Sequence, residues 1–539
     1  MAKTSDGAEQ RRYRVMWDQN AGQEMYYNPP ISPQRVAQAT FGFFEGRPVD
    51  AYVGAMGSNA GFTVGWPTKV ENAEFIVDRL QRGRRIGDIK LWRHAEQLRL
   101  AFEAGIDFEQ VKVEEARRLG VDFFFRLGMN DWHHLASEAD ESNLWSGDFF
   151  AERPELWIGD EGARGWPEKL WNVLRFFQDF AHEEVRNLRR DLAIEACERY
   201  EVDGFLFDFM RCPGYFKRGA EEAGMPLMTE LLAQTRDALR RIGSGRGRSI
   251  RFAVRVPNTI GGSERLGLDV RNWVKDGLVD IVVPSSFFAQ DMEEDVGEWV
   301  DLVSDTPVQL YPAIEEGYAP GHTGNFNRWY FQPPVMSPMS NEMLRGIAAR
   351  HHARGVDGIY TFNFFGSAPT YDYDNREAVD DVADPIRLQH KDKVFVVMRS
   401  HASFPNCLVT EHQLPLTLST EPAAVTVDVP DDLRTAADRL ALCRLRVHLT
   451  NVEVYDGIEV SLNGAVLECS NPIEGGEYRM RNGGQQWLEY DLQHALPAQG
   501  SNEIGLRLTA RLERLAAEFD ITVEDIELEI RYEYPNGAW

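Results

Sequence analysis

Short apolar runs alternate with amphipathic segments of helical length over most of the chain. Two of the runs begin with the same three residues, Val202-Asp203-Gly204 and Val356-Asp357-Gly358, and each follows a helical stretch. Six more runs share this rhythm and cover residues 14–20, 51–57, 121–130, 250–258, 278–287 and 306–316. Repeated β-α units imply parallel pairing, and eight of them form a (β/α)8 TIM barrel. The pattern therefore predicts an α/β fold with a barrel domain over residues 12–388.

The rhythm changes near the end of the barrel segment. From Lys393 onward, alternating apolar and polar runs are separated by turn signals such as Leu462-Asn463-Gly464. No segment of core-helix length interrupts them before Ala510–Glu518. Short strands at this spacing are typical of a sandwich of two sheets. We therefore expect a second, all-β sandwich domain over residues 392–539.

Composition and charge exclude several classes of partner. The chain has 539 residues, with 85 acidic and 58 basic side chains and a net charge of −27, which argues against nucleic acid and anionic membranes as partners. The five cysteines form no CxxC pair, so we expect no metal, no disulfide framework and no other cofactor. A polar N-terminus and the lack of a ~20-residue apolar stretch predict a cytoplasmic protein. A homo-oligomer is compatible with these features.

Charged residues collect on one side of the predicted strands. Side chains on a strand alternate between the helices and the barrel axis. The outward set is almost wholly apolar, as with Phe205, Phe207 and Phe209. The inward set contains polar and ionisable residues, namely Asp18, Arg126, Asn130, Asp208, Arg255 and Glu315. Buried ionisable groups are costly unless they are paired or functional, so this set marks either an ion-pair network or an active site.

Tryptophans gather after the predicted strands. Those at or after the C-terminal strand ends are Trp17, Trp66, Trp92, Trp132, Trp145, Trp157, Trp166 and Trp329. Indole rings stack on the apolar faces of sugar rings, so a cleft lined by tryptophan suits carbohydrate. Large loops also need large side chains for their own small cores, and we expect half or more of these tryptophans to be structural.

Residues 200–211, YEVDGFLFDFMR, resemble the fourth-strand signature of glycoside-hydrolase-like barrels, in which DG-x-x-x-D ends on an acid. They are most similar to the family-10-like glycosyl hydrolase group. Glu315-Glu316-Gly317 resembles the E-x-G that ends the nucleophile strand of the large retaining clan. The chain departs from that clan at Asp208-Phe209, where the clan has Asn-Glu, and from chitinase-like barrels at Met210. The segment 457–464 resembles jelly-roll modules appended to carbohydrate enzymes.

The resemblance and the inward acids together predict a glycoside hydrolase that acts on an oligo- or polysaccharide with two carboxylates, most simply with retention. The catalytic candidates are Asp208 and Glu315, with Glu316 as the substitute should the register slip by one. We expect Glu315 as the nucleophile and Asp208 as the acid/base. The candidates for substrate binding are Asp18, Trp17, Arg126, Asn130, Trp132, Arg211, Arg255, Asn258, Tyr311, Trp329 and Asn363.

Three alternatives remain open at this point. Asp18, Asp208 and Glu315 could serve as oxygen ligands in a metal-dependent TIM-barrel hydrolase or isomerase. An arginine and Tyr311 could neutralise a uronate and abstract a proton in a polysaccharide lyase. The barrel could also bind glycans without catalysis.

Overall fold

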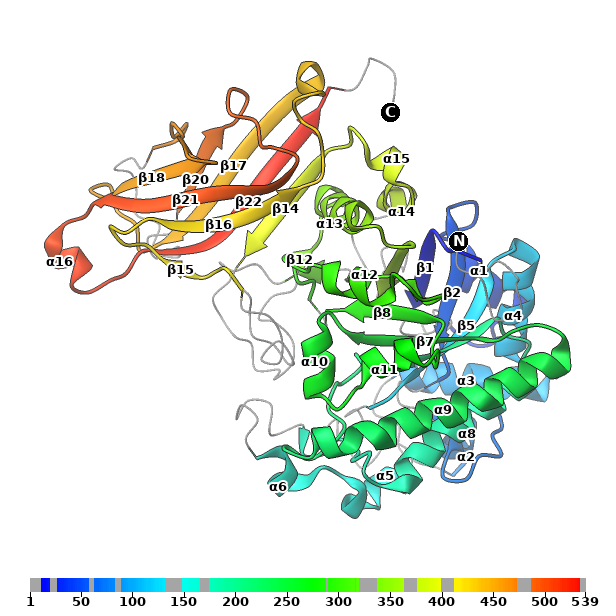
Figure 1. Cartoon of the computed structure of the whole chain (residues 1–539). Coiled ribbons are helices and arrows are strands. Elements are labelled where there is room, and N and C mark those ends of the chain that lie inside the picture. The colour runs from blue at the N-terminus through cyan, green and yellow to red at the C-terminus, as the bar shows by residue number, and fades with distance from the viewer. Residues whose placement is uncertain are drawn as a thin grey trace.

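The structure is a computed structural model in which a parallel sheet with surrounding helices is followed by two antiparallel sheets (Figure 1). It describes residues 11–19, 27–57, 63–82, 89–130, 148–164, 174–286, 289–315, 317–318, 337–362, 376–398, 412–472 and 486–533. Within these residues, every helix is too short or too polar to cross a bilayer.

Strands form at all eight predicted apolar runs. They make one nine-stranded sheet in the order β10-β13-β1-β2-β5-β6-β7-β8-β9, in which all neighbours are parallel. Their bounds are β1 Val15–Gln19, β2 Val49–Ala55, β5 Asp122–Gly128, β6 Gly204–Asp208, β7 Arg251–Pro257, β8 Ile281–Ser285, β9 Gln309–Leu310, β10 Ala313–Glu315 and β13 Ile359–Phe362. The two ends of the sheet, β9 and β10, are separated in the sequence only by Tyr311 and Pro312. Both belong to the predicted run 306–316, and β9 pairs with β8 while β10 pairs with β13. The sheet therefore curls like a TIM barrel, but neither short strand pairs on both sides, so the closed barrel that the sequence predicts is found only in part.

Aspartates at the starts of alternate strands tie the sheet together. Each accepts the backbone N–H of a residue at the start of another strand, at 2.7–2.9 Å; they are Asp50, Asp203, Asp280 and Asp357. The glycine that follows two of them is required by close packing. A Cβ at Gly204 would lie 2.1 Å from the Phe124 ring, and one at Gly358 would lie 2.0 Å from the carbonyl oxygen of Tyr13. The repeated Val-Asp-Gly sequence thus has a structural role: its aspartate binds the start of another strand and its glycine allows close packing.

Helices lie between consecutive strands and cover the outside of the sheet (Figure 1). They begin and end where capping residues allow. Ser340 caps one helix by accepting the N–H of Met343, and Gly355 ends it with a φ of 91°. The bounds are α1 Pro33–Phe41, α2 Ile76–Gln81, α3 Ile89–Glu103, α4 Phe108–Leu119, α5 Asp148–Ala151, α6 Gly159–Ala163, α8 Glu183–Arg199, α9 Glu221–Arg246, α10 Ile260–Arg265, α11 Val270–Lys275, α12 Gly297–Val303, α13 Asn341–Arg354, α14 Arg376–Val382 and α15 Pro385–Leu388. Two short pairs, β3 Thr63–Val64 with β4 Glu74–Phe75 and β11 Gly317–Tyr318 with β12 Ser337–Pro338, lie between them.

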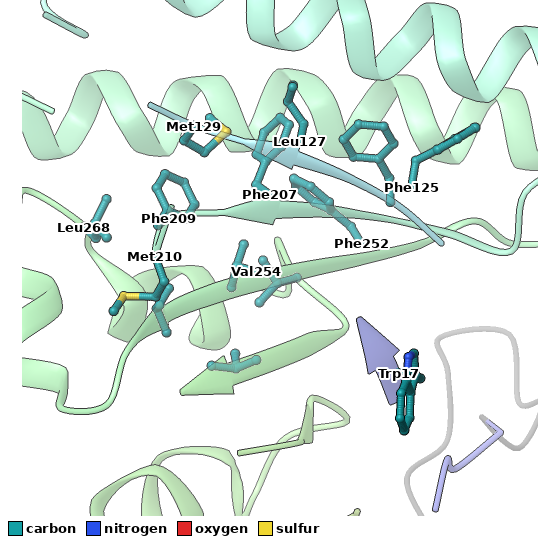
Figure 2. Close-up of a cluster of buried hydrophobic side chains, with 14 of the residues drawn as sticks. Trp17, Phe125, Leu127, Met129, Phe207, Phe209, Met210, Phe252, Val254 and Leu268 are labelled. Carbon is teal, nitrogen blue, oxygen red and sulfur yellow. The ribbon is translucent and has the colours of Figure 1, made fainter. Parts of the chain in front are cut away.

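Two separate cores lie on the two faces of the parallel sheet. The outer core, between strands and helices, contains Phe125, Phe207 and Val254, whose side chains Figure 2 shows beside their strands. The inner core contains residues of the opposite parity, such as Phe124 and Leu206. This division confirms the alternation predicted from the sequence. It also decides which side chains can meet inside the sheet.

The C-terminal part is formed by two antiparallel sheets around a third core. Their strands are β14 Lys393–Met398, β15 Leu416–Thr417, β16 Ala423–Val429, β17 Leu440–Thr450, β18 Gly457–Leu462, β19 Ala465–Val466, β20 Gln486–Asp491, β21 Gly500–Ala510 and β22 Thr522–Tyr532, with α16 Glu513–Ala516 before the last. Strand β14 belongs to two cores. Val396 and Met398 pack into the outer core of the barrel-like part, whereas Phe395 and Val397 pack into the sandwich. The alternating runs after Lys393 are thus strands, as predicted. The domain limits 12–388 and 392–539 remain a prediction.

Candidate functional site

Five ionisable side chains from five strands meet inside the parallel sheet. They are Asp18 of β1, Arg126 of β5, Asp208 of β6, Arg255 of β7 and Glu315 of β10, and all are almost completely buried. The register explains why they meet. Asp208 pairs with Arg255 across β6 and β7, while Glu315 and Asp18 are both register partners of Phe362 on β13. Because parallel strands bring their C-terminal ends to one side, these residues lie where barrel enzymes carry their chemistry.

The two arginines link the three acids into one network. Arg126 contacts Asp18 through Nε at 3.1 Å and Asp208 through Nη1 at 2.9 Å. Arg255 contacts Asp208 through Nη1 at 3.4 Å and donates from Nη2 to Glu315 Oε1 at 2.6 Å. One guanidinium group therefore bridges Asp208 and Glu315, the two carboxyls that the sequence predicts to be catalytic.

Neutral groups complete the network. Ser285 Oγ accepts from Arg255 Nε at 2.9 Å and from Nη2 at 2.7 Å. The Arg255 guanidinium lies 3.5 Å from the centre of the Phe362 ring, and the Tyr360 hydroxyl donates to Asp18. Sequence reasoning missed these three residues. The inward parity of Tyr360 and Phe362 was the signal that could have found those two.

The acids are held in different charge states. Burial raises the pKa of Asp208, but Arg255, Arg126 and the N–H of Met210 together outweigh it and hold that pKa below its usual value. Burial raises the pKa of Glu315 to about 8, with Arg255 offsetting only part of the effect and Asp208 adding to it. Burial likewise raises the pKa of Asp18 to about 6, against the charge of Arg126. Near neutral pH, Asp208 is therefore ionised and Glu315 is protonated.

A count of the buried charges also indicates that one of the three carboxyls is protonated. Three carboxyl groups face two guanidinium groups, and all five side chains are 0–1% exposed. One protonated carboxyl makes the network neutral, which avoids an uncompensated buried charge. Asp208 contacts both arginines, and Asp18 accepts from the Tyr360 hydroxyl besides Arg126, so Glu315, which shares Arg255 with Asp208, is the group to hold that proton.

This charge state predicts how stability depends on pH. The folded pKa of Glu315 lies above its ordinary value of 4.5, so its stabilising contribution is fully present below about pH 4.5 and is lost as the pH rises toward about 8. The unfolding free energy of the wild-type chain should therefore fall relative to that of Glu315→Gln between these two pH values. Urea unfolding of both chains at a series of pH values measures the difference. Parallel curves across this range would contradict the assignment.

Several predicted substrate-binding residues lie elsewhere. Trp17 faces the outer core because it shares the parity of the outward residue Val15. The centre of its ring lies 4.7 Å from that of Phe43 and 5.8 Å from that of Phe44. Tyr311 faces inward but belongs to the opposite end of the sheet, where its hydroxyl donates to Gln309 and accepts the N–H of Tyr13. These two predictions are corrected by the structure. Trp66, in the same outer core, donates to Glu195.

Asn130 and Asn258 donate hydrogen bonds to residues of the loops. Asn130 Nδ2 donates to the carbonyls of Gln178 and Gly214, and its Oδ1 accepts the N–H of Gln178. Asn258 donates to Asp291 at 2.9 Å. Arg211 is buried, and its N–H donates to Asp208 Oδ1 at 3.1 Å, so its backbone contacts the candidate site. Glu316, Trp132, Trp329 and Asn363 lie outside the described residues.

Comparisons with known proteins add little to this geometry. No protein-family model and no curated protein matches the chain. Among solved structures, alpha-L-fucosidase isoenzyme 2 from Paenibacillus thiaminolyticus is 12% identical, with a TM-score of 0.40, over 69% of this chain and 49% of its own. An alpha-L-fucosidase from Bacteroides thetaiotaomicron is 9% identical, with a TM-score of 0.34, over 91% and 84%. A chitinase from Chromobacterium violaceum is 10% identical, with a TM-score of 0.32, over 69% and 99%.

These similar structures are glycoside hydrolases by name, and none is named as a member of the family-10-like group. With TM-scores of 0.32–0.40, they decide neither the activity nor the residues of this chain. The activity has to be inferred from the chain's own site.

Proposed function

We propose that this protein is a glycoside hydrolase whose two catalytic carboxyls are Asp208 and Glu315. The observation that carries the proposal is the contrast in their contacts: both buried carboxyls contact Arg255, but Asp208 also contacts Arg126, so its pKa is held below the usual value while burial raises that of Glu315. Glycosidic hydrolysis needs one carboxylic acid to protonate the leaving oxygen and one carboxylate as nucleophile or base. Both are therefore available near neutral pH without any further group.

The charge states favour the reverse of the roles expected from the sequence. Asp208, held ionised by two arginines, suits the nucleophile, and Glu315, held protonated by burial, suits the acid/base. The two carboxyls are bound by adjacent nitrogens of one guanidinium group, which spans only a few ångström. Such closeness fits the carboxyl separation of about 5–5.5 Å in retaining enzymes better than the larger one that admits an attacking water. We therefore propose retention.

The remaining inward acid suits substrate binding. Asp18 Oδ2 is bound by Arg126 and Tyr360, whereas Oδ1 has no hydrogen-bond partner among the described residues although it is buried. An unpaired carboxylate oxygen inside a protein is costly, and a sugar hydroxyl would satisfy it. Asp18 is thus proposed to accept from a hydroxyl of the bound sugar.

Two alternatives lose support from the same geometry. Arg126 and Arg255 lie between the three carboxyls that a metal would need, so a divalent cation there would face two guanidinium charges. The lyase hypothesis used Tyr311, whose hydroxyl is engaged with Gln309 and the N–H of Tyr13. Neither arrangement offers the chemistry that these alternatives require.

The proposal is tested by a panel of aryl α- and β-glycosides of hexoses, 6-deoxyhexoses, N-acetylhexosamines and uronates, together with polysaccharides. We expect turnover of at least one sugar class, and proton NMR should show that the first-formed product keeps the anomeric configuration. An inverted first product would make Asp208 a base instead of a nucleophile. No turnover by a folded protein across the panel would leave the five buried residues as a structural ion-pair network.

A further inference from the structure

The loop that follows β8 holds the backbone of Glu315. Gln290 Oε1 accepts the N–H of Glu315 at 2.9 Å, and the N–H of Gln290 donates to the carbonyl of Gly317 at 2.9 Å. Gln290 and Glu315 are both buried, with 4% and 1% of their surfaces exposed. One residue therefore fixes the chain on both sides of the Glu315 side chain.

The side-chain amide of Gln290 has a defined orientation. Its Nε2 donates to Glu294 Oε2 at 3.2 Å and to the carbonyl of Asp291 at 3.1 Å, which leaves Oε1 to accept from Glu315. The reversed amide would place its own N–H groups against the N–H of Glu315. Glu294 therefore selects the orientation that binds Glu315.

The same loop contacts the other half of the Glu315–Arg255 pair. The carbonyl of Ser286 accepts from Arg255 Nη2 at 3.4 Å and from Ser285 Oγ at 2.9 Å. Ser286 Oγ accepts the N–H of Asp291 at 3.0 Å and donates to Glu294 Oε2 at 3.4 Å. The buried carboxyl of Glu294 thus accepts hydrogen bonds from both Gln290, which contacts Glu315, and Ser286, which contacts Arg255.

Glu294 suits this position as a neutral group. Burial and the charge of Asp291 raise its pKa well above the usual value, and Gln290, Arg350 and Ser286 offset only part of this. A protonated carboxyl still accepts hydrogen bonds and needs no counter-ion. Its second oxygen, Oε1, is buried and has no hydrogen-bond partner among the described residues.

We propose that Gln290, oriented by Glu294, is a positioning residue that holds Glu315 against Arg255. Its meaning for catalysis rests on the proposed function, but the placement of Glu315 does not. Gln290 touches only the backbone of Glu315, so it acts through that residue and takes no part in proton transfer. The loop after β8 thereby fixes the position of Glu315 on β10.

Gln290→Met keeps the size of the side chain and removes its hydrogen bonds. On the aryl glycoside with the highest turnover, we expect kcat to fall about tenfold to a hundredfold with little change in KM, because a shift of the acid by about 1 Å is enough for such a loss. Loosening Glu315 admits water and weakens the burial effect that raises its pKa. The basic limb of the pH–rate profile should therefore move to lower pH.

A second variant exchanges the two side chains: it keeps the hydrogen bond from the Glu315 N–H and reverses the one between positions 290 and 294. In Gln290→Glu/Glu294→Gln, a carboxyl at position 290 that stays protonated, as that of Glu294 does, accepts from Glu315 and from the amide at position 294 and donates to the carbonyl of Asp291. We expect this double variant to recover most of the kcat and the position of the basic limb, whereas Gln290→Glu alone faces Glu294 with a second carboxyl and does not. If Gln290→Met fails to fold, Glu294→Ala, which removes the partner of the Gln290 amide and of Ser286 Oγ, should shift the limb in the same direction.

The control is Gln309→Met, which removes another buried glutamine that binds Arg251 and Tyr311. It should lower the melting temperature without moving the basic limb. Infrared difference titration against Glu315→Gln reads the Glu315 carboxyl directly and needs no substrate. An unchanged titration in Gln290→Met, or no recovery in the double variant, overturns the inference. Full activity of Glu315→Gln overturns the proposed function instead, while the titration still decides the role of Gln290.

Discussion

Asp208→Asn is expected to remove nearly all turnover while the chain stays folded. If Asp208 is the nucleophile, its loss costs on the order of 10⁴- to 10⁶-fold in kcat, as for other covalent catalysts. The fold should tolerate the change because two carboxyls then face two guanidinium groups, and Glu315 can ionise to balance them. Steady-state kinetics and the melting temperature measure the two effects separately.

Glu315→Gln should behave differently in a way that identifies its role. An amide replaces a carboxyl that stays neutral only in the folded chain, so near neutral pH the variant should be at least as stable as the wild type. The rate loss should be about 10²- to 10⁴-fold on substrates with poor leaving groups, which need a proton, and small on dinitrophenyl glycosides, which do not. Asp208→Asn should be equally slow on both kinds of substrate.

Azide provides the complementary control. With Glu315→Gln, azide should accelerate turnover and give a glycosyl azide of retained configuration, because a glycosyl-enzyme intermediate still forms on Asp208. With Asp208→Ala, the azide product should have the inverted configuration. The opposite pairing of products with variants would return Glu315 to the role of nucleophile, and near-normal activity in both variants would exclude the pair.

The sequence predicts the membership of the site better than its chemistry. Alternation along the strands placed Asp18, Arg126, Asp208, Arg255 and Glu315 inward, and all five meet. Their charge states were not predictable, because each pKa depends on which arginine contacts which acid across neighbouring strands. That contact is set by the register of the sheet, and for this reason we propose the reverse of the roles expected for Asp208 and Glu315.

The errors have local physical causes. Trp17 was predicted from its place at a strand end, although its parity with Val15 directs it to the outer core. Tyr311 has the correct parity but lies four residues before Glu315, or roughly 13 Å along a strand, at the far end of the sheet. Asn130 lies beyond the end of β5, where alternation no longer applies. Gln290 and Glu294 belong to an irregular loop, whose path no periodicity predicts.

The largest effect on stability is expected at Arg255. Arg255→Met leaves three buried carboxyls with one guanidinium group, so the folded chain must retain an unpaired charge or bind another proton. Removing one partner of a buried ion pair typically costs about 3–5 kcal/mol, and we expect a loss of that size in urea unfolding at pH 7. Arg251→Met is the matched control. It removes another buried arginine of β7, whose guanidinium donates to the Arg11 carbonyl and to Gln309, and it should cost less.

A double-mutant cycle turns this loss into a test of the charge states. Arg255 contacts Asp208 at 3.4 Å and Glu315 at 2.6 Å, so distance alone favours the stronger coupling with Glu315. If Asp208 is ionised and Glu315 neutral, the coupling energy at pH 7 should instead be larger for Arg255 with Asp208, because a full charge interacts more strongly than a dipole. The coupling with Glu315 should then rise as the pH passes its pKa of about 8. A Glu315 coupling that is already the larger one at pH 7 and constant with pH would show that Glu315 is ionised, which would remove the acid from the proposed mechanism.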